Sequence, residues 1–197
     1  MGRVSGAGDP DAPALPPFTL VTGNPDKRLE AERILGRAVD CAAVDLPEPQ
    51  SLDFLEVVRA KGAEALQRLG HPVVVEEAGL ELAALNGFPG PLVKWMLEAV
   101  GAEGIARTAL ALGEPRATAR CFLLWTDGAR EVIGEGATTG TLVTPRGSGG
   151  FGWDPAFLPD GEERTYGELP GADKDRLSHR GRAWRDLLAK LGSSSQA

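Results

Sequence analysis

Cysteine is scarce in this sequence, which contains only Cys41 and Cys121, far apart along the chain. Small disulfide-stabilised domains carry several cysteines, and structural zinc sites need closely spaced cysteine or histidine ligands. The N-terminus also lacks the pattern of a signal peptide. These absences argue against a disulfide scaffold or a zinc site and favour the reducing cytoplasm.

Long apolar runs and an excess of basic residues are also missing. No stretch approaches the roughly 20 apolar residues needed to span a bilayer, so we expect a soluble protein without a membrane partner. The 21 Lys and Arg residues are outnumbered by 28 Asp and Glu residues, for a formal net charge of −7. Nonspecific binding of a nucleic-acid polymer needs a basic surface, so this class is disfavoured. A pocket for a single nucleotide remains compatible with this charge.

The length and composition suit one well-packed domain. The chain has 197 residues, of which 42% are hydrophobic and 25% charged, and shows no internal repeat. Residues 1–17 are rich in Gly, Pro, Ala and Asp and are expected to form a disordered leader. We expect a single domain over residues 18–192 and a flexible tail over residues 193–197.

The first predicted strand, residues 18–21, leads through a turn into a helix over residues 26–36. The first turn of a helix has free N–H groups and the positive end of the helix dipole, so it can bind an anion. Thr22, Asn24 and Lys27 are suited to assist there. The alternative is a plain connection in which Asn24 only caps the helix.

A second strand over residues 39–46 is followed by a helix that Ser51 caps and that ends near Gly70. The next predicted strand lies within residues 71–80, where a β-branched run ends in Glu76 and Glu77. Ligands of open α/β sheets bind at such strand ends, where Glu77 is suited to hold Mg²⁺ or to activate water. The alternative is a pair of solvated acids at the end of a strand.

Two helices, over residues 93–98 and 103–112, are predicted in the middle of the chain. Trp95 is expected in the core or in a subunit contact. Alternating segments over residues 118–126 and 131–136 predict a hairpin.

The stretch Gly149–Pro155 combines glycines, which allow close approach, with the flat rings of Phe151 and Trp153. It predicts either a pocket wall on which a ring stacks or a hairpin whose aromatics fill the core. A C-terminal helix opens near Ala172. Ser178, His179 and Arg180 either fan around a ligand or form a basic first turn in solvent.

Taken together, these stretches resemble the inosine triphosphate pyrophosphatases over roughly residues 18–191. The resemblance rests on five motifs, which are Thr22-Gly23-Asn24-Pro25-Asp26-Lys27, Val75-Glu76-Glu77-Ala78-Gly79-Leu80, Gly87-Phe88-Pro89-Gly90-Pro91 with Lys94-Trp95, Phe151-Gly152-Trp153-Asp154-Pro155, and Ser178-His179-Arg180. The stretch from Asp45 to Glu48 and the Lys94-Trp95 pair look more like the eukaryotic-type branch of the family.

The resemblance implies an α/β fold in which a central mixed sheet carries helices on both sides and two lobes flank a nucleotide-binding cleft. It implies Mg²⁺-dependent hydrolysis of deaminated purine nucleoside triphosphates (ITP, dITP and XTP) to the monophosphate and pyrophosphate. A homodimer is implied as well.

The resemblance also implies a role for individual residues. The triphosphate tail would be held by Thr22, Asn24 and Lys27, with further charges from Lys61 and Lys174. Glu48 and Glu77 would place the metal, and Glu77 and Lys61 would be catalytic, with Glu77 at the water-activating position. The base would contact Phe151, Trp153, Asp154, Ser178, His179 and Arg180.

Two departures from the family pattern bear on activity. Glu77 and Ala78 stand where the family has Asp followed by Ser or Thr, and a displacement near 1 Å at a reacting group can cost on the order of a hundredfold in rate. Two alternatives therefore stay open. One is a nucleotide-binding protein that has lost hydrolysis, and the other is a pyrophosphatase for another modified or pyrimidine nucleotide.

Overall fold

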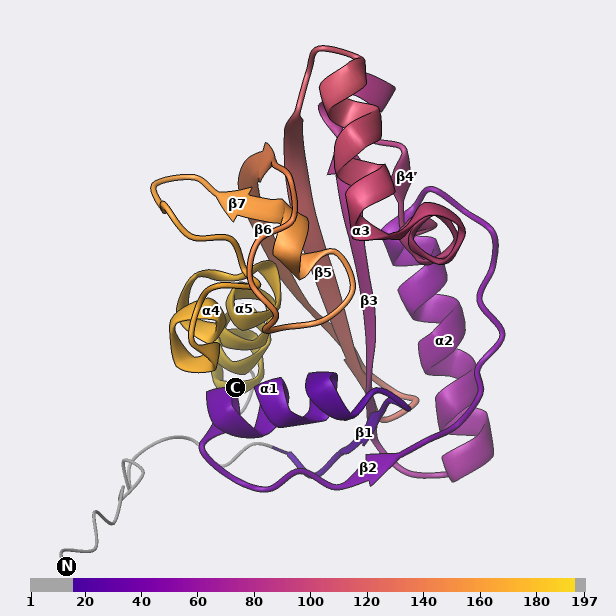
Figure 1. The fold of residues 1–197 in the computed structure, drawn as a ribbon. Helices are drawn as coiled ribbons and strands as arrows, with labels where there is room; N and C mark the ends of the chain where they lie inside the picture. The colour runs from indigo at the N-terminus through magenta and orange to yellow at the C-terminus, as the bar shows by residue number, and fades with distance from the viewer. Residues whose placement is uncertain (1–15, 194–197) are drawn as a thin grey trace, which may run out of the picture.

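The computed structural model describes residues 16–193, and a seven-stranded mixed sheet runs through its centre (Figure 1). The strand order is β2-β1-β3-β5-β6-β7, with β4 paired to β3. The strands are β1 (Thr19–Val21), β2 (Cys41–Ala42), β3 (Val73–Leu82), β4 (Pro89–Gly90), β5 (Arg116–Thr126), β6 (Glu131–Leu142) and β7 (Phe157–Pro159). The leader and the tail predicted from the sequence lie outside the described residues, apart from residues 16, 17 and 193.

Helices cover both faces of the sheet, which confirms the predicted fold class (Figure 1). The helices are α1 (Pro25–Leu35), α2 (Phe54–Leu69), α3 (Val93–Ala111), α4 (Gly171–Leu177) and α5 (His179–Ser193), with single turns η1 (Ala83–Leu85) and η2 (Asp154–Ala156). Among the described residues, no helix is both long and apolar enough to cross a membrane.

The alternation of side chains along β3 separates the core into layers. Val74 packs in one cluster with residues of α1 and α5, whereas Val73 and Val75 pack in another with residues of α2. A third cluster joins Leu80 and Leu82 to α3. Neighbouring residues of β3 therefore face different helices.

Strand β3 is paired unequally on its two edges. On one edge it pairs with β5 along its whole length, from Val73 to Leu82. On the other edge it is parallel to β1 only at Val73 and Val74, and antiparallel to β4 only at Leu80 and Glu81. The edge between these two contacts is open.

The full-length pairing with β5 corrects one expectation. Glu76 and Glu77 lie inside β3 rather than at its end, because β5 holds the strand in an extended conformation as far as Leu82. They still lie directly beyond the last pair with β1, at the end of the parallel part of the sheet. The ligand edge expected for these acids is thus present.

Two helix boundaries also differ from the prediction. Asp53, not Ser51, caps α2, since its side chain accepts the N–H of Leu55, while Ser51 accepts the N–H of Asp53. The predicted C-terminal helix is two helices, because Ser178 is extended (φ −73°, ψ 158°).

Other boundaries follow the backbone freedom of glycine. Gly101 (φ 67°, ψ 177°) separates α3 into two helical parts, as predicted. Strand β6 continues beyond the predicted end at Gly136 as far as Leu142, and a Cβ atom on Gly136 would collide with the backbone of His179 and Ala183. This glycine lets the start of α5 lie directly on the sheet.

Candidate active site

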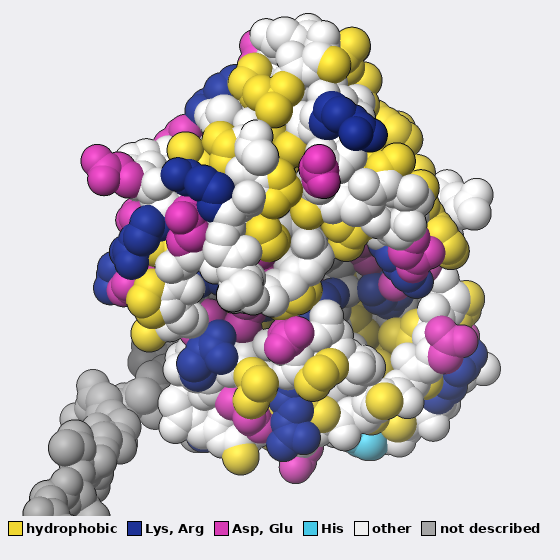
Figure 2. Space-filling model, viewed as in Figure 1, with side chains coloured by type: hydrophobic (Ala, Val, Ile, Leu, Met, Phe, Trp, Pro, Cys, Tyr) yellow, Lys and Arg dark blue, Asp and Glu magenta, His cyan; other side chains and the backbone are white. Residues whose placement is uncertain are grey.

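A cavity of about 610 Å³ is lined by the turn between β1 and α1, the start of α3, and the loop that carries Phe151 and Trp153. Figure 2 shows the surface hollowed there, with basic and acidic side chains close together. Ten of the residues predicted from the sequence line it, namely Thr22, Asn24, Lys27, Glu48, Lys61, Phe151, Trp153, Asp154, His179 and Arg180. The other three, Glu77, Lys174 and Ser178, are not among its lining residues, and Glu77 contacts the lining residue Lys61.

The turn from β1 into α1 forms one end of the cavity. Asn24 caps α1, because its Oδ1 atom accepts the N–H of Asp26 at 2.8 Å and that of Lys27 at 3.4 Å. The hydroxyl oxygen of Thr22 accepts the N–H of Asn24 at 3.1 Å. The capping role expected as the alternative is therefore present, and it fixes this turn in the cavity wall.

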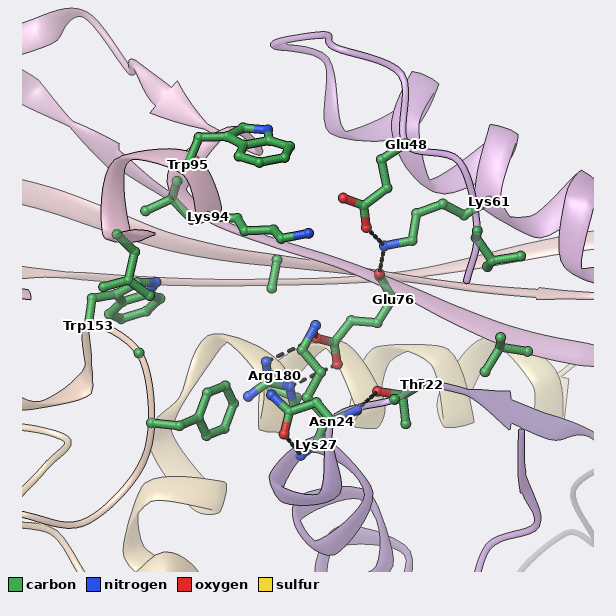
Figure 3. A pocket seen from close by; sticks show the side chains of 18 of the residues that line it. Thr22, Asn24, Lys27, Glu48, Lys61, Glu76, Lys94, Trp95, Trp153 and Arg180 are labelled. Carbon is green, nitrogen blue, oxygen red and sulfur yellow. Dashed lines mark hydrogen bonds and ion pairs between the residues drawn. The ribbon is translucent and has the colours of Figure 1, made fainter. Parts of the chain in front are cut away.

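Two carboxylates, those of Glu48 and Glu77, meet at Lys61, and Figure 3 shows the contacts of Lys61 with Glu48 and with Glu76. The Nζ atom of Lys61 donates to Glu48 Oε1 at 2.9 Å, to Glu77 Oε2 at 3.0 Å and to the carbonyl oxygen of Glu76 at 2.8 Å. Because one ammonium joins both carboxylates, Glu48 and Glu77 are close together although they come from different segments.

The surroundings of Glu77, Glu48 and Lys61 shift their pKa values in different ways. Burial raises the pKa of Glu77 and outweighs the opposing charge of Lys61. The pKa of Glu48 is lowered, since Lys61 outweighs the effect of burial on this more exposed side chain. Burial acts to lower the pKa of Lys61, but Glu77 and Glu48 raise it.

This donor set fits Mg²⁺. The ion is commonly held by one or two carboxylates together with substrate phosphates and water, rather than by an all-protein cage. Glu48 and Glu77 supply such a pair, and among the described residues no cluster of three or more His, Cys, Asp or Glu forms a complete metal site.

A chain of buried ion pairs runs from Lys27, next to the turn between β1 and α1, to Asp154 in the Gly149–Pro155 stretch. We call it the Glu76 network, and its members are Lys27, Glu76, Arg180, Glu30, Lys174 and Asp154. Its three carboxylates balance its three cations. The network links α1, β3, η2, α4 and α5 through side chains that are almost fully buried, Lys27 excepted.

Glu76 lies at the centre of this network. Its Oε1 atom is 2.9 Å from Lys27 Nζ and accepts from Arg180 Nη2 at 2.9 Å, while its Oε2 atom accepts from Arg180 Nε at 2.8 Å. Burial acts to raise the pKa of Glu76, but Arg180 and Lys27 outweigh it and the pKa is lowered well below its usual range. No role was predicted for Glu76, although its position beside Glu77 on a strand places it on the opposite face.

Lys174 does not occupy the position expected of a phosphate ligand. It is 3% exposed, and its Nζ atom donates to Glu30 and Asp154. The same atom lies 4.8 Å from the centre of the Phe151 ring. The charge of Lys174 is thus balanced by two buried carboxylates, and the side chain packs against the Phe151 ring.

The Gly149–Pro155 stretch is a turn that leads into η2 rather than a hairpin, and its two aromatic side chains lie in different surroundings. Trp153 is buried and packs edge-on against Phe157, with ring centroids 5.5 Å apart, as a core residue does. Phe151 is only partly buried and lines the cavity. Asp154 accepts the N–H of Phe151 at 2.7 Å and so fixes the loop that carries this ring.

The start of α5 also lines the cavity, through His179 and Arg180. The hydroxyl of Ser178 accepts the N–H of Gly181 at 3.1 Å, so Ser178 is turned inward and stabilises the first turn of the helix. His179 is 2% exposed and lies 5.3 Å from Trp153, measured between ring centroids. Within residues 16–193 its Nδ1 atom has no hydrogen-bond partner.

Lys94 and Trp95 line the mouth of the cavity, although no role at the site was predicted for them. Trp95 is 54% exposed, which excludes the core position, while the subunit contact given as the other possibility stays a prediction. Lys94 Nζ lies 5.0 Å above the centre of the Trp95 ring, and Figure 3 shows this amine directed toward Glu48 and Lys61. The Lys94-Trp95 motif was the available signal.

The buried state of His179 predicts a dependence of stability on pH. Burial, together with Arg180 and Lys174, holds its pKa well below the ordinary value of 6.5. Below about pH 6.5 the unfolded chain therefore binds a proton that the folded chain does not, and stability falls as the pH falls, by up to about 1.4 kcal/mol per pH unit. Urea unfolding between pH 7.5 and 5.5 should show a smaller fall for His179→Gln.

The matched control for this measurement is His71→Gln. His71 is exposed between α2 and β3, so the stability of His71→Gln should fall with pH as steeply as that of the parent protein. Equal slopes for His179→Gln and the parent would contradict the account of a neutral, buried imidazole.

The chain is similar to known proteins in sequence and in fold. The model of the Ham1 family matches residues 18–190. The chain is 37% identical over 177 residues to a protein from the fungus Puccinia graminis named inosine triphosphate pyrophosphatase, covering 84% of this chain and 92% of the relative.

Solved structures show the same fold. A HAM1 protein from Coxiella burnetii has a TM-score of 0.75 and 25% identity, covering 91% of this chain and 100% of the other. A dITP/XTP pyrophosphatase from Mycobacterium abscessus has a TM-score of 0.65 and 30% identity, covering 87% and 98%. With a family match over almost the whole described chain and a eukaryotic relative of this similarity, the protein belongs to the Ham1 family.

Proposed function

We propose that this protein hydrolyses ITP, dITP and XTP to the monophosphate and pyrophosphate and so removes deaminated purines from the nucleotide pool. The observation that carries the proposal is the set of groups that one cavity brings together. The helix-capping turn with Lys27, the Lys61 amine with Glu48, and Phe151 with Arg180 all line it. The Puccinia and Mycobacterium relatives are named for this activity.

At the phosphate end, the cations Lys27, Lys61 and Lys94 are suited to bind the triphosphate. Glu48 and Glu77 are the residues that would hold Mg²⁺, which supplies positive charge against the phosphate oxygens when it is bound. Glu77 also accepts the proton of the attacking water. The water oxygen forms a bond to the α-phosphorus, and the bridging oxygen leaves with pyrophosphate.

The base end favours a 6-keto purine. A guanidinium has five N–H groups, and in Arg180 three nitrogens donate to Glu76 and Glu30, which leaves two N–H groups for a ligand. A 6-keto oxygen accepts such a hydrogen bond, whereas the 6-amino group of adenine opposes one donor with another. Buried donors left unpaired in this way lower the affinity for the wrong base. Phe151 offers its ring for stacking.

Pyrophosphate release from ITP, XTP, dITP, ATP and GTP tests the proposal, with Mg²⁺ and with EDTA at mildly alkaline pH. We expect metal-dependent release from the first three and little from ATP or GTP. Silence across the panel while ITP still binds would replace the proposal by a nucleotide-binding protein without hydrolysis. A strong preference for another triphosphate would replace the substrate class.

The length of the Glu77 side chain gives a second test. Where the family has Asp, the extra methylene moves the carboxylate, so Glu77→Asp is expected to raise kcat for ITP, by about tenfold. Glu77→Gln, which removes the base, should lower it by about a hundredfold to ten-thousandfold. A lower kcat in Glu77→Asp would show that the site has re-formed around glutamate.

We also propose a cytoplasmic homodimer. The two free cysteines, Cys41 and Cys121, are compatible with a reducing compartment. Exposed apolar side chains gather in and beside α3, including Trp95, Val100 and Leu110, and Figure 2 shows apolar surface over this part of the molecule. Burial of such a patch favours association.

Light scattering after size exclusion tests the oligomer. We expect twice the chain mass for the parent and for Leu52→Glu, a control at an exposed leucine before α2, but the monomer mass for Leu110→Glu. A monomeric parent protein at micromolar concentration would contradict the dimer.

A further inference from the structure

The loop between β6 and η2, residues 143–153, carries Phe151 into the cavity but has no helix or strand of its own. Its stretch from position 147 to 152 contains four glycines, and most of the loop is exposed to solvent. Glycine loses more backbone freedom on folding than any other residue. Contacts from outside the loop must therefore hold it in one conformation.

The second half of the loop is held by η2. The carboxylate of Asp154 accepts the N–H of Phe151 at 2.7 Å, and the N–H of Asp154 donates to the carbonyl oxygen of Phe151 at 3.2 Å. In the first half, the N–H of Arg146 donates to the carbonyl oxygen of Pro155 at 2.9 Å. The carbonyl oxygen of Arg146 has a different partner.

That partner is Thr165, in the segment between β7 and α4. Its side chain is fully buried, and its hydroxyl donates to the carbonyl oxygen of Arg146 at 2.8 Å. Two residues further on, the carbonyl oxygen of Gly167 accepts the N–H of Gly149 at 2.9 Å. A Cβ atom on Gly147 would collide with the same carbonyl group. The first half of the loop therefore lies directly on the segment that contains Thr165.

Glu168 fixes Thr165 in turn. Its Oε2 atom accepts the N–H of Thr165 at 2.9 Å and lies 3.2 Å from the hydroxyl oxygen of the same residue. It also lies 3.4 Å from the Nε atom of Arg146. Neither Thr165 nor Glu168 is among the residues that line the cavity, so they can influence a ligand there only through the loop.

We propose that Thr165 is a positioning residue for the base of the nucleotide. Through the carbonyl group of Arg146, its hydroxyl holds the loop in the conformation that presents the Phe151 ring to the purine. A loop that is ordered before the ligand arrives loses less entropy when the base stacks on it, and the affinity is higher. This inference rests on the proposed function and adds to it a residue outside the cavity.

Replacement of the hydroxyl tests the proposal by calorimetry. Thr165→Val has nearly the same shape without the hydroxyl, and Thr165→Ser keeps the hydroxyl. The ligands are inorganic pyrophosphate and an ITP analogue with a methylene group between the α and β phosphates. We expect Thr165→Val to bind the analogue about three- to tenfold more weakly, the loss of one hydrogen bond, and to bind pyrophosphate like the parent. Thr165→Ser should restore the affinity for the analogue.

Two results would overturn the proposal. One is an unchanged affinity of folded Thr165→Val for the analogue. The other is an equal loss of affinity for pyrophosphate, because pyrophosphate has no base and such a loss would indicate a general disturbance of the structure.

Steady-state kinetics adds a matched control. Stacking on Phe151 contributes equally to the bound substrate and to the transition state, so Thr165→Val should raise KM for ITP and keep kcat. Thr108→Val removes a hydroxyl that also donates to a main-chain carbonyl at 2.8 Å, that of Gly104 within α3. It should keep the parent KM. A KM raised equally in both variants would overturn the proposal.

Hydrogen exchange of the ligand-free protein measures the order of the loop independently of activity. We expect the amides of Gly149 and Phe151 to exchange faster in Thr165→Val than in the parent or in Thr108→Val. Unchanged exchange at both amides would overturn the proposal. If Thr165→Val does not fold, the exposed acid Glu168 provides the deciding variant. Glu168→Ala should weaken binding of the analogue alone, and parent affinity in this variant would overturn the proposal.

The outcomes separate this inference from the proposed function. ITP hydrolysis by the parent, with parent affinity and KM in Thr165→Val, would overturn the inference alone. Binding of the analogue without hydrolysis of ITP would overturn the proposed function, and a weaker affinity of Thr165→Val for the analogue would still support the role of Thr165. A parent protein that binds pyrophosphate but not the analogue would overturn both.

Discussion

The ion pair between Glu76 and Arg180 is the interaction on which the rest of the site depends. It joins the centre of the sheet to the first turn of α5, and through Lys27 and Glu30 it also holds α1. Buried charges are costly unless they are paired, and removal of one partner from such a pair typically costs about 3–5 kcal/mol. The network therefore fixes α1, β3 and α5 relative to one another around the cavity.

The alternation of β3 explains how adjacent acids acquire different tasks. Glu76 faces α1 and α5 and is kept ionised by two cations, whereas Glu77 faces α2 and retains a raised pKa. An ionised carboxylate is suited to anchor Arg180, and one with a raised pKa is suited to accept a proton near neutral pH. One strand thus supplies the anchor of Arg180 and the proposed base from consecutive positions.

Local features of the sequence predicted the parts of the site that short segments determine. The turn with Thr22 and Asn24 has its capping geometry written in adjacent residues, and the strand that carries Glu77 is recognisable from its β-branched run. The overall fold class was predicted from the resemblance to the inosine triphosphate pyrophosphatases. Ser51 misled because Asp53, two residues further on, is an equally good cap.

Long-range pairing determined what the sequence did not reveal. The buried ammonium of Lys174 donates a hydrogen bond to Glu30, far away on α1, and no local pattern records that contact. The extension of β3 beyond Glu77 depends on its pairing with β5, and the exposure of Trp95 depends on how α3 packs in the fold. Sequence patterns locate a charged residue along the chain, but only the fold decides whether its partner is a substrate or another side chain.

The most direct measurement of the central claim, that water attacks the α-phosphorus at Glu77, is hydrolysis of ITP in ¹⁸O-labelled water, followed by mass analysis of both products. The account predicts one labelled oxygen in the nucleoside monophosphate and unlabelled pyrophosphate. Label in the pyrophosphate, or release of orthophosphate in its place, would contradict it.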